Sequence, residues 1–219
     1  LRTRLREEGW AHFSAQYMNN PVPEENATFK KTWFQYFEPG DMKGKLLNKF
    51  LVIDPALSTA KDADYTAMVI VGQDEYGILY ILDIVRGRFS PHDIIEKMIG
   101  FAREWNISDI GIEMVAFQKT LAYSLREHPS FKRQPFHITE VYPNDRTNEY
   151  RIKALQPLYE NGKIYHNKLH PNTIYLEDEL VRFPLGAHDD IIDAVSYCLD
   201  LIYPAKQKNA RTGASHWLY

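Results

Sequence analysis

The chain has 219 residues, of which 44% are hydrophobic and 13% aromatic, and its formal net charge is −3. This composition predicts a packed core and excludes a largely disordered chain. The single cysteine, Cys198, excludes an intrachain disulfide framework and a cysteine-based zinc site, and it favours a reducing compartment. No apolar run approaches the ~20 residues of a membrane span, and no signal peptide is visible. Because the chain begins with Leu1 rather than Met, we expect it to be part of a longer protein.

Residues 1–48 differ in character from the rest of the chain. A short helix-like piece gives way to proline and asparagine in "NNPVPEENATF" (19–29), which is typical of an extension or linker. The tail 205–219 is basic and rich in small residues, so we expect it to be poorly ordered. The sequence therefore predicts one folded domain over residues 49–204.

Within that domain the pattern predicts strands first and helices later. The expected strands are 49–56, 64–72, 77–87, 109–115 and 136–143. The expected helices are 90–106, 117–128, 147–162, 173–184 and a last one that begins near residue 189. Three hairpin-linked strands followed by β–α–β units predict a mixed five-stranded α/β sheet of order 3-2-1-4-5. No glycine-rich phosphate loop is present, which argues against a nucleotide-binding actin-like fold.

Two acids lie at the carboxyl ends of strands predicted to be neighbours. Asp54 ends the first strand, and Glu113 interrupts the otherwise apolar fourth strand. Ligands of open α/β sheets gather at that edge. An unpaired buried charge is costly, so Glu113 should have a cationic partner, which is either a basic side chain or a metal ion.

The stretch "GAHDDIIDAV" (186–195) places Asp189, Asp190 and Asp193 at the beginning of the last helix. One interpretation is that these acids cap free backbone N–H groups. The other is that they join Asp54 and Glu113 in an all-oxygen cluster, which suits Mg²⁺ or Mn²⁺ and disfavours zinc.

With these acids in place, the chain resembles the RNase H-like nucleases, and among them the nuclease domain of the large terminase of tailed bacteriophages. The segments that carry the resemblance are "FSAQYMNNP" (13–21), "VIDPALSTAKDADYTAMVIV" (52–71), "IGIEMVAFQ" (110–118), "RIKALQPLYENGKIYH" (151–166) and "LEDELVRFPLGAHDDIIDAVSY" (176–197). The resemblance implies an RNase H-like fold and a metal-dependent endonuclease that cuts concatemeric double-stranded viral DNA during genome packaging by two-metal hydrolysis. It implies that Asp54 bridges two Mg²⁺ or Mn²⁺ ions, that Glu113 binds one, and that Asp190 or Asp189 binds the other.

The resemblance also implies partners and a location. Double-stranded DNA, the portal protein and the small terminase subunit are the expected partners, at the procapsid portal in the host bacterial cytoplasm. An ATPase domain is expected in the full-length protein, and residues 1–48 would lead out of it.

Several further residues have weaker predicted roles. Asp193 is expected to support the metal ligands or to be structural, and His188 could ligate a metal or orient a phosphate. Asp83 could reach the same edge in a supporting role, but it is expected to be structural, in an ion pair with Arg86 or Arg88. Asp64 lies in a turn from which it could approach a metal. The candidate DNA-backbone contacts are Lys119, Arg146, Arg151 and Lys153.

Two alternatives stay open at this point. The same fold could serve a Holliday-junction resolvase or an RNase H-type nuclease. A non-catalytic DNA-binding or portal-docking module would use the acids only as helix caps and ion-pair partners.

Overall fold

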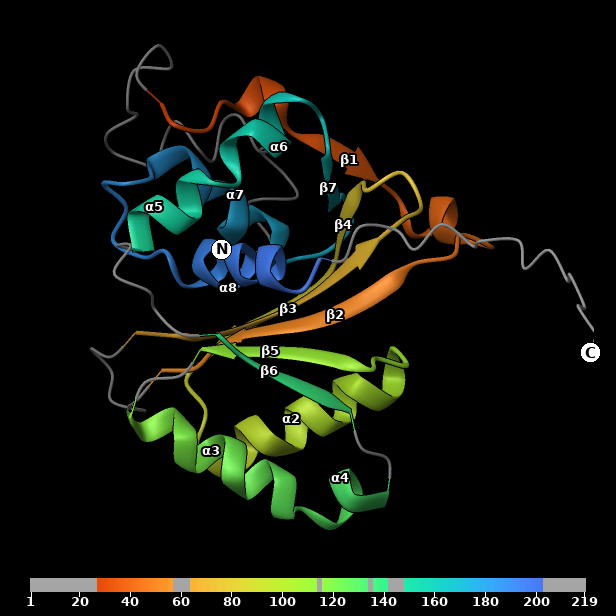
Figure 1. The fold of residues 1–219 in the computed structure, drawn as a ribbon. Helices are drawn as coiled ribbons and strands as arrows, with labels where there is room; N and C mark the ends of the chain where they lie inside the picture. The colour runs from red at the N-terminus through yellow and green to blue at the C-terminus, as the bar shows by residue number, and fades with distance from the viewer. Residues whose placement is uncertain (1–26, 57–63, 114–115, 134–135, 142–147, 203–219) are drawn as a thin grey trace, which may run out of the picture.

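The computed structural model describes residues 27–56, 64–113, 116–133, 136–141 and 148–202. Seven strands form one mixed sheet in the order β1-β7-β4-β3-β2-β5-β6 (Figure 1). Their bounds are β1 Gln35–Phe37, β2 Asn48–Asp54, β3 Thr66–Gln73, β4 Leu79–Gly87, β5 Asp109–Glu113, β6 His137–Val141 and β7 Ile164–Asn167.

The five central strands confirm the predicted order, because β4-β3-β2-β5-β6 is the expected 3-2-1-4-5 arrangement. Strands β2, β3 and β4 pair antiparallel, whereas β5 runs parallel to both β2 and β6. The predicted number of strands was wrong, since β7 and β1 extend the sheet beyond β4 in parallel pairings. These two strands have four and three residues, which is too short for a clear alternating pattern.

Helices cover both faces of the sheet (Figure 1). The helices on one face are α2 (Pro91–Glu104), α3 (Ala116–Glu127) and α4 (Pro129–Arg133). Those on the other face are α5 (Asn148–Lys153), α6 (Gln156–Glu160), α7 (Thr173–Arg182) and α8 (Asp190–Tyr197), which continues into the 3-10 turn η3 (Cys198–Asp200). Two hydrophobic clusters separated by the sheet form the core: Val52 belongs to the cluster under α8, and its neighbour Ile53 to the cluster under α2.

One predicted helix is broken in the structure. The expected helix 147–162 is two short helices, α5 and α6, and Pro157 stands in the first turn of the second. A proline fits the first turn of a helix but removes a backbone donor from a helix interior, which explains the break.

Part of the predicted extension packs onto the sheet. Phe29 and Phe34 are buried in the core under α8, and β1 pairs with β7 at the edge of the sheet. A 3-10 turn on either side of β1, η1 (Lys31–Trp33) and η2 (Pro39–Met42), completes this segment. Residues 1–26 and the tail 205–219 lie outside the described residues, so the predicted boundaries at 48 and 204 stay predictions.

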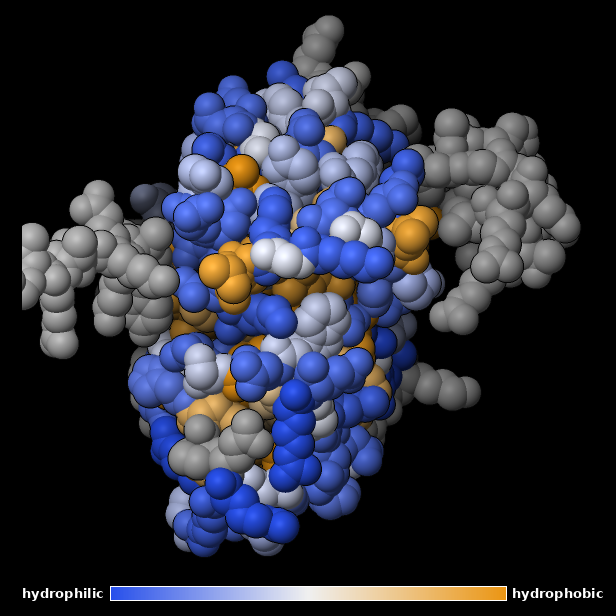
Figure 2. All heavy atoms as spheres, turned by 90° about the vertical axis from the view of Figure 1, so that its right-hand side faces the viewer, coloured by the Kyte–Doolittle hydropathy of each residue, from blue (hydrophilic) through white to orange (hydrophobic). Residues whose placement is uncertain are grey.

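The face of the molecule in Figure 2 is mainly polar. Hydrophilic side chains cover most of it, and apolar side chains appear there only in separate patches. No helix within the described ranges has both the length and the apolar character needed to cross a membrane.

Candidate metal centre

Asp54 and Glu113 lie side by side at the carboxyl edge of the sheet. Strands β2 and β5 are parallel, and Ile53 is paired with Ile112, so the two acids are the next residues on neighbouring strands. Side chains alternate along a strand, and both acids therefore point to the face that α8 covers. This arrangement brings together two carboxyl groups from segments about sixty residues apart, as the predicted strand order implied.

Helix α8 adds two buried acids to the same place. Asp190 and Asp193 are three residues apart, and one face of a helix carries such a pair. Burial raises the pKa of Asp54 well above its usual range, and the charges of Asp193 and Glu113, a hydrogen bond with Glu113 and the charge of Asp190 raise it further. Burial also raises the pKa of Asp193 to about 6, although Arg151 opposes this shift. Among the described residues, Asp193 therefore interacts with Asp54 at least as strongly as Asp190 does.

The start of α8 is capped from another helix. Asp189 is the N-cap residue, but its side chain makes no capping hydrogen bond. Instead, Glu179 of α7 accepts hydrogen bonds from the backbone N–H groups of Ile191 (2.8 Å) and Ile192 (3.0 Å) through its Oε2 atom. The interpretation of Asp189 as a side-chain cap was therefore wrong, because the donors it would have satisfied are taken by Glu179.

Asp190 is tied to β4 and to the segment before β3. Its Oδ2 accepts a hydrogen bond from Arg86 Nη2 at 2.9 Å, and its Oδ1 accepts one from the backbone N–H of Tyr65 at 3.1 Å. Arg86 also lies 3.7 Å from Glu179 and stacks over the ring of Tyr65, 3.9 Å from its centroid. The sequence did not identify Arg86 or Glu179 as site residues, since nothing in their local pattern separates them from other surface charges.

The predicted pairing of Asp83 with Arg86 was wrong. Asp83 forms an ion pair with His170 at 2.9 Å, while Arg86 is occupied by Asp190. Arg88, the other expected partner, stacks over the ring of Tyr65.

Arg151 contacts the acid cluster. Its Nη2 lies 2.9 Å from Asp193 Oδ1, and the same atom donates to Asn148 Oδ1 (3.0 Å) and to the Tyr197 hydroxyl (3.3 Å). Burial lowers the pKa of Arg151, but Tyr197, Asp193 and Glu113 together outweigh burial and raise it. This residue therefore faces the carboxylates.

Of the other basic candidates, Lys153 is the one whose side chain the structure describes. It is exposed and paired with Glu149 on the surface of α5. Lys119 lies in α3, but its side chain, like the whole of Arg146, falls outside the described residues.

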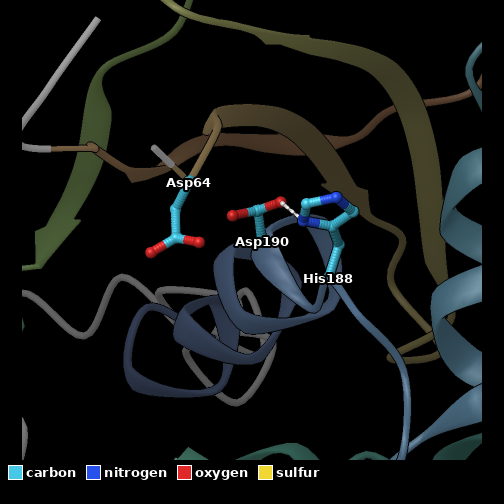
Figure 3. Close-up of side chains that lie close together, drawn as sticks. All are labelled: Asp64, His188 and Asp190. Carbon is cyan, nitrogen blue, oxygen red and sulfur yellow. Dashed lines mark ion pairs between the residues drawn. The ribbon is translucent and has the colours of Figure 1, made fainter. Parts of the chain in front are cut away.

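A second group of possible ligands shares Asp190 (Figure 3). One side-chain ligand atom from each of Asp64, His188 and Asp190 lies within 4.8 Å of the others. His188 Nδ1 is 3.8 Å from Asp190 Oδ2, and the pKa of Asp189 is raised by burial and by the charges of Asp190 and Asp64. Asp190 thus belongs to this group and also adds to the negative charge around Asp54.

The donor chemistry of these residues suits a divalent cation. Asp54, Glu113, Asp190 and Asp193 supply only carboxylate oxygens, which suit hard cations. The negative charges of these carboxylates repel one another, and the two neighbouring arginines balance these charges only in part. Among the described residues, the ligand atoms that form a group of three within 4.8 Å of one another are those of Asp64, His188 and Asp190.

Solved structures with the same architecture come from viral terminases. The human cytomegalovirus terminase nuclease domain, soaked with Mn and bound to an inhibitor, matches with a TM-score of 0.58 and 15% identity, over 80% of this chain and 95% of that chain. The large terminase nuclease from thermophilic phage G20c with bound zinc matches with a TM-score of 0.52 and 15% identity, over 76% and 84%. A mutant nuclease domain of the large terminase subunit of bacterial virus Sf6, with manganese, matches with a TM-score of 0.54 and 13% identity, over 79% and 98%. These likenesses confirm the predicted RNase H-like fold.

A search of curated proteins finds no match. The family model described as the terminase RNaseH-like domain, however, matches residues 51–201, which is more than half of the chain. The predicted resemblance is confirmed, and the chain belongs to the terminase RNaseH-like domain family.

Proposed function

We propose that the chain is a divalent-metal-dependent endonuclease that hydrolyses phosphodiester bonds of double-stranded viral DNA during genome packaging. One observation carries the proposal: the pairing of Ile53 with Ile112 sets Asp54 beside Glu113, beneath the acids of α8. Membership of the terminase family supports DNA as the substrate. The portal protein and the small terminase subunit, as partners, follow from the family alone.

Asp54, Glu113, Asp190 and Asp193 would hold the cations, and Mg²⁺ or Mn²⁺ suits their oxygen donors. When bound, two divalent cations activate water and stabilise the charge of the attacking and leaving oxygens. Asp64 and His188 extend the group around Asp190. Asp189, which is exposed, is a weaker candidate than Asp193, which adds to the charge around Asp54.

The surrounding residues fix the carboxylates in place. Arg86 and the Tyr65 N–H hold both oxygens of Asp190, and Glu179 fixes the start of the helix that carries Asp190 and Asp193. Such preorganisation reduces the reorganisation needed when substrate and cations bind.

The test is cleavage of supercoiled plasmid in Mg²⁺, Mn²⁺, Ca²⁺ or EDTA by the parent, Asp54→Asn and Glu113→Gln. Asp109→Asn is the matched control, because Asp109 lies at the opposite end of β5 from Glu113. We expect cleavage by the parent and the control in Mg²⁺ or Mn²⁺, and its loss in EDTA and in both site variants.

A parent that folds and binds DNA but cleaves with none of the metals would overturn the proposal and favour a non-catalytic module. Faster cleavage of four-way junctions or RNA–DNA hybrids than of duplex would instead favour a resolvase or an RNase H-type enzyme.

A further inference from the structure

Arg151 pairs with Asp193 through one hydrogen bond and not through a bidentate contact. Within the part of the chain that the structure describes, its three hydrogen bonds all use the single atom Nη2, whereas the strong Arg–carboxylate geometry uses two nitrogens on two oxygens. Its Nε is buried and has no hydrogen-bond partner among the described residues. The guanidinium is thus placed against the carboxylates without the bidentate contact that would make the pair hard to break.

The position of Arg151 is one that a cation favours. The side chain is only 13% exposed, and it packs over the ring of Tyr197 with its guanidinium carbon 4.5 Å from the centroid. Glu113 and Asp193 both add to the electrostatic stabilisation of its charge. A single positive charge therefore lies where the carboxylates from β5 and α8 converge.

The other arginine of the site shares part of this arrangement. Arg86 also donates to its carboxylate through Nη2 alone, and its Nε is likewise buried without a hydrogen-bond partner among the described residues. Arg86 differs because it stacks on Tyr65 and lies 3.7 Å from a second acidic side chain, Glu179, which the backbone N–H groups of α8 hold in place. Among the described residues, the ion pair of Arg151 is with Asp193 alone.

We propose that Arg151 is a resident counter-cation of the metal-free site, which a divalent cation displaces from Asp193 when it binds. The inference rests on the proposed function, because it takes Asp193 as one of the metal-holding acids. It predicts a competition: removal of the guanidinium charge strengthens metal binding. A residue that served only to position Asp193 would have the opposite effect, since its loss would weaken metal binding.

The experiment measures Mn²⁺ binding by isothermal titration calorimetry to the parent, Arg151→Met and Arg151→Lys. A cation that must break a close buried charge pair in order to bind loses at least a factor of about ten in its binding constant. We therefore expect the methionine variant to bind Mn²⁺ at least about tenfold more tightly than the parent. Lysine keeps the charge, so we expect affinity within a few-fold of the parent. If the methionine variant does not fold, Arg151→Gln gives the same neutral test and keeps a polar group near Asn148.

Arg126→Met is the matched control, since it removes an Arg–carboxylate pair of similar length (3.0 Å, to Glu140) in which Arg126 is half exposed. That pair lies on the α3 side of the sheet, so we expect no change in Mn²⁺ affinity. Unchanged or weaker Mn²⁺ binding in Arg151→Met, with a parent that binds Mn²⁺, would overturn the inference and leave the proposed function standing. A parent that binds no Mn²⁺ would overturn the metal site itself, and with it the inference.

Discussion

The buried carboxyl group of Glu179 gives a stability prediction that can be worked out from the structure. Glu179 accepts two backbone N–H groups of α8 and lies 3.7 Å from Arg86, and these contacts lower its pKa. Burial outweighs them and raises the pKa from 4.5 to about 8. Proton binding by Glu179 therefore stabilises the parent at acid pH, and this contribution is lost as the pH rises. Glu179→Gln does not titrate, so we expect its stability to lack this dependence on pH.

The sign and size of the change in unfolding free energy with pH follow from proton linkage. Between the unfolded pKa and the folded pKa, the unfolded chain has lost the proton that the folded chain retains, so stability falls by about 1.4 kcal/mol per pH unit. Between pH 5 and pH 8 this amounts to roughly 4 kcal/mol. A glutamine oxygen can still accept both N–H groups, whereas Glu179→Ala leaves them unpaired at a cost of about 2–4 kcal/mol at any pH.

The assay is urea unfolding of parent, Glu179→Gln and Glu179→Ala in EDTA from pH 5 to pH 8. The glutamine variant should gain stability relative to the parent with rising pH, because the other titrating acids are common to both chains. Parallel pH profiles for the parent and the glutamine variant would refute the reasoning. They would mean that Arg86 and the helix N–H groups keep Glu179 ionised throughout.

Three further predictions concern the site and its support. Asp54→Asn should raise the thermal midpoint of the metal-free protein, because burial and the neighbouring acids raise the pKa of Asp54 and so disfavour its charged form, and it should abolish stabilisation by Mn²⁺. Differential scanning fluorimetry in EDTA and in Mn²⁺ measures both effects. Ser90→Ala should cost about 1 kcal/mol in urea unfolding, because Ser90 forms a capping box with Asp93 at the start of α2. Gly111→Val should destabilise by about 1–3 kcal/mol in the same assay, since an added Cβ would meet Leu201 Cδ1 at 2.7 Å.

The sequence was sufficient to predict the central sheet and the edge where its acids meet. Alternation and turn residues identify β2 to β6, and the β–α–β rules give their order, so Asp54 and Glu113 could be placed side by side from the sequence pattern alone. Strand β7 was not predicted because its four residues include the buried His166. The partners of His166, Tyr159 and Glu177, come from α6 and α7. A polar residue satisfied by tertiary contacts looks, in the sequence, like a residue of a loop.

The supporting residues of the site could not be predicted for the same physical reason. Arg86 and Arg151 come from a strand and a helix far apart in the sequence, and each meets an acid of α8 only through the packing of the whole domain. Local rules describe contacts within a few residues, such as the Lys153–Glu149 pair on α5. They leave open which surface charge becomes a buried partner.

The three acids at the start of α8 differ in the contacts that they make. Asp189 is exposed, Asp190 is held by Arg86 and the Tyr65 N–H, and Asp193 faces Asp54 and Arg151. None of the three is needed to cap the helix, because Glu179 does so from α7. With a pKa of about 8, Glu179 caps the helix at neutral pH largely without a further negative charge beside Asp190. A fully ionised cap at this position would add to the repulsion around Asp190. The carboxylates of α8 are therefore left to interact with cations, and the helix that carries them is fixed by a group that interferes little with them.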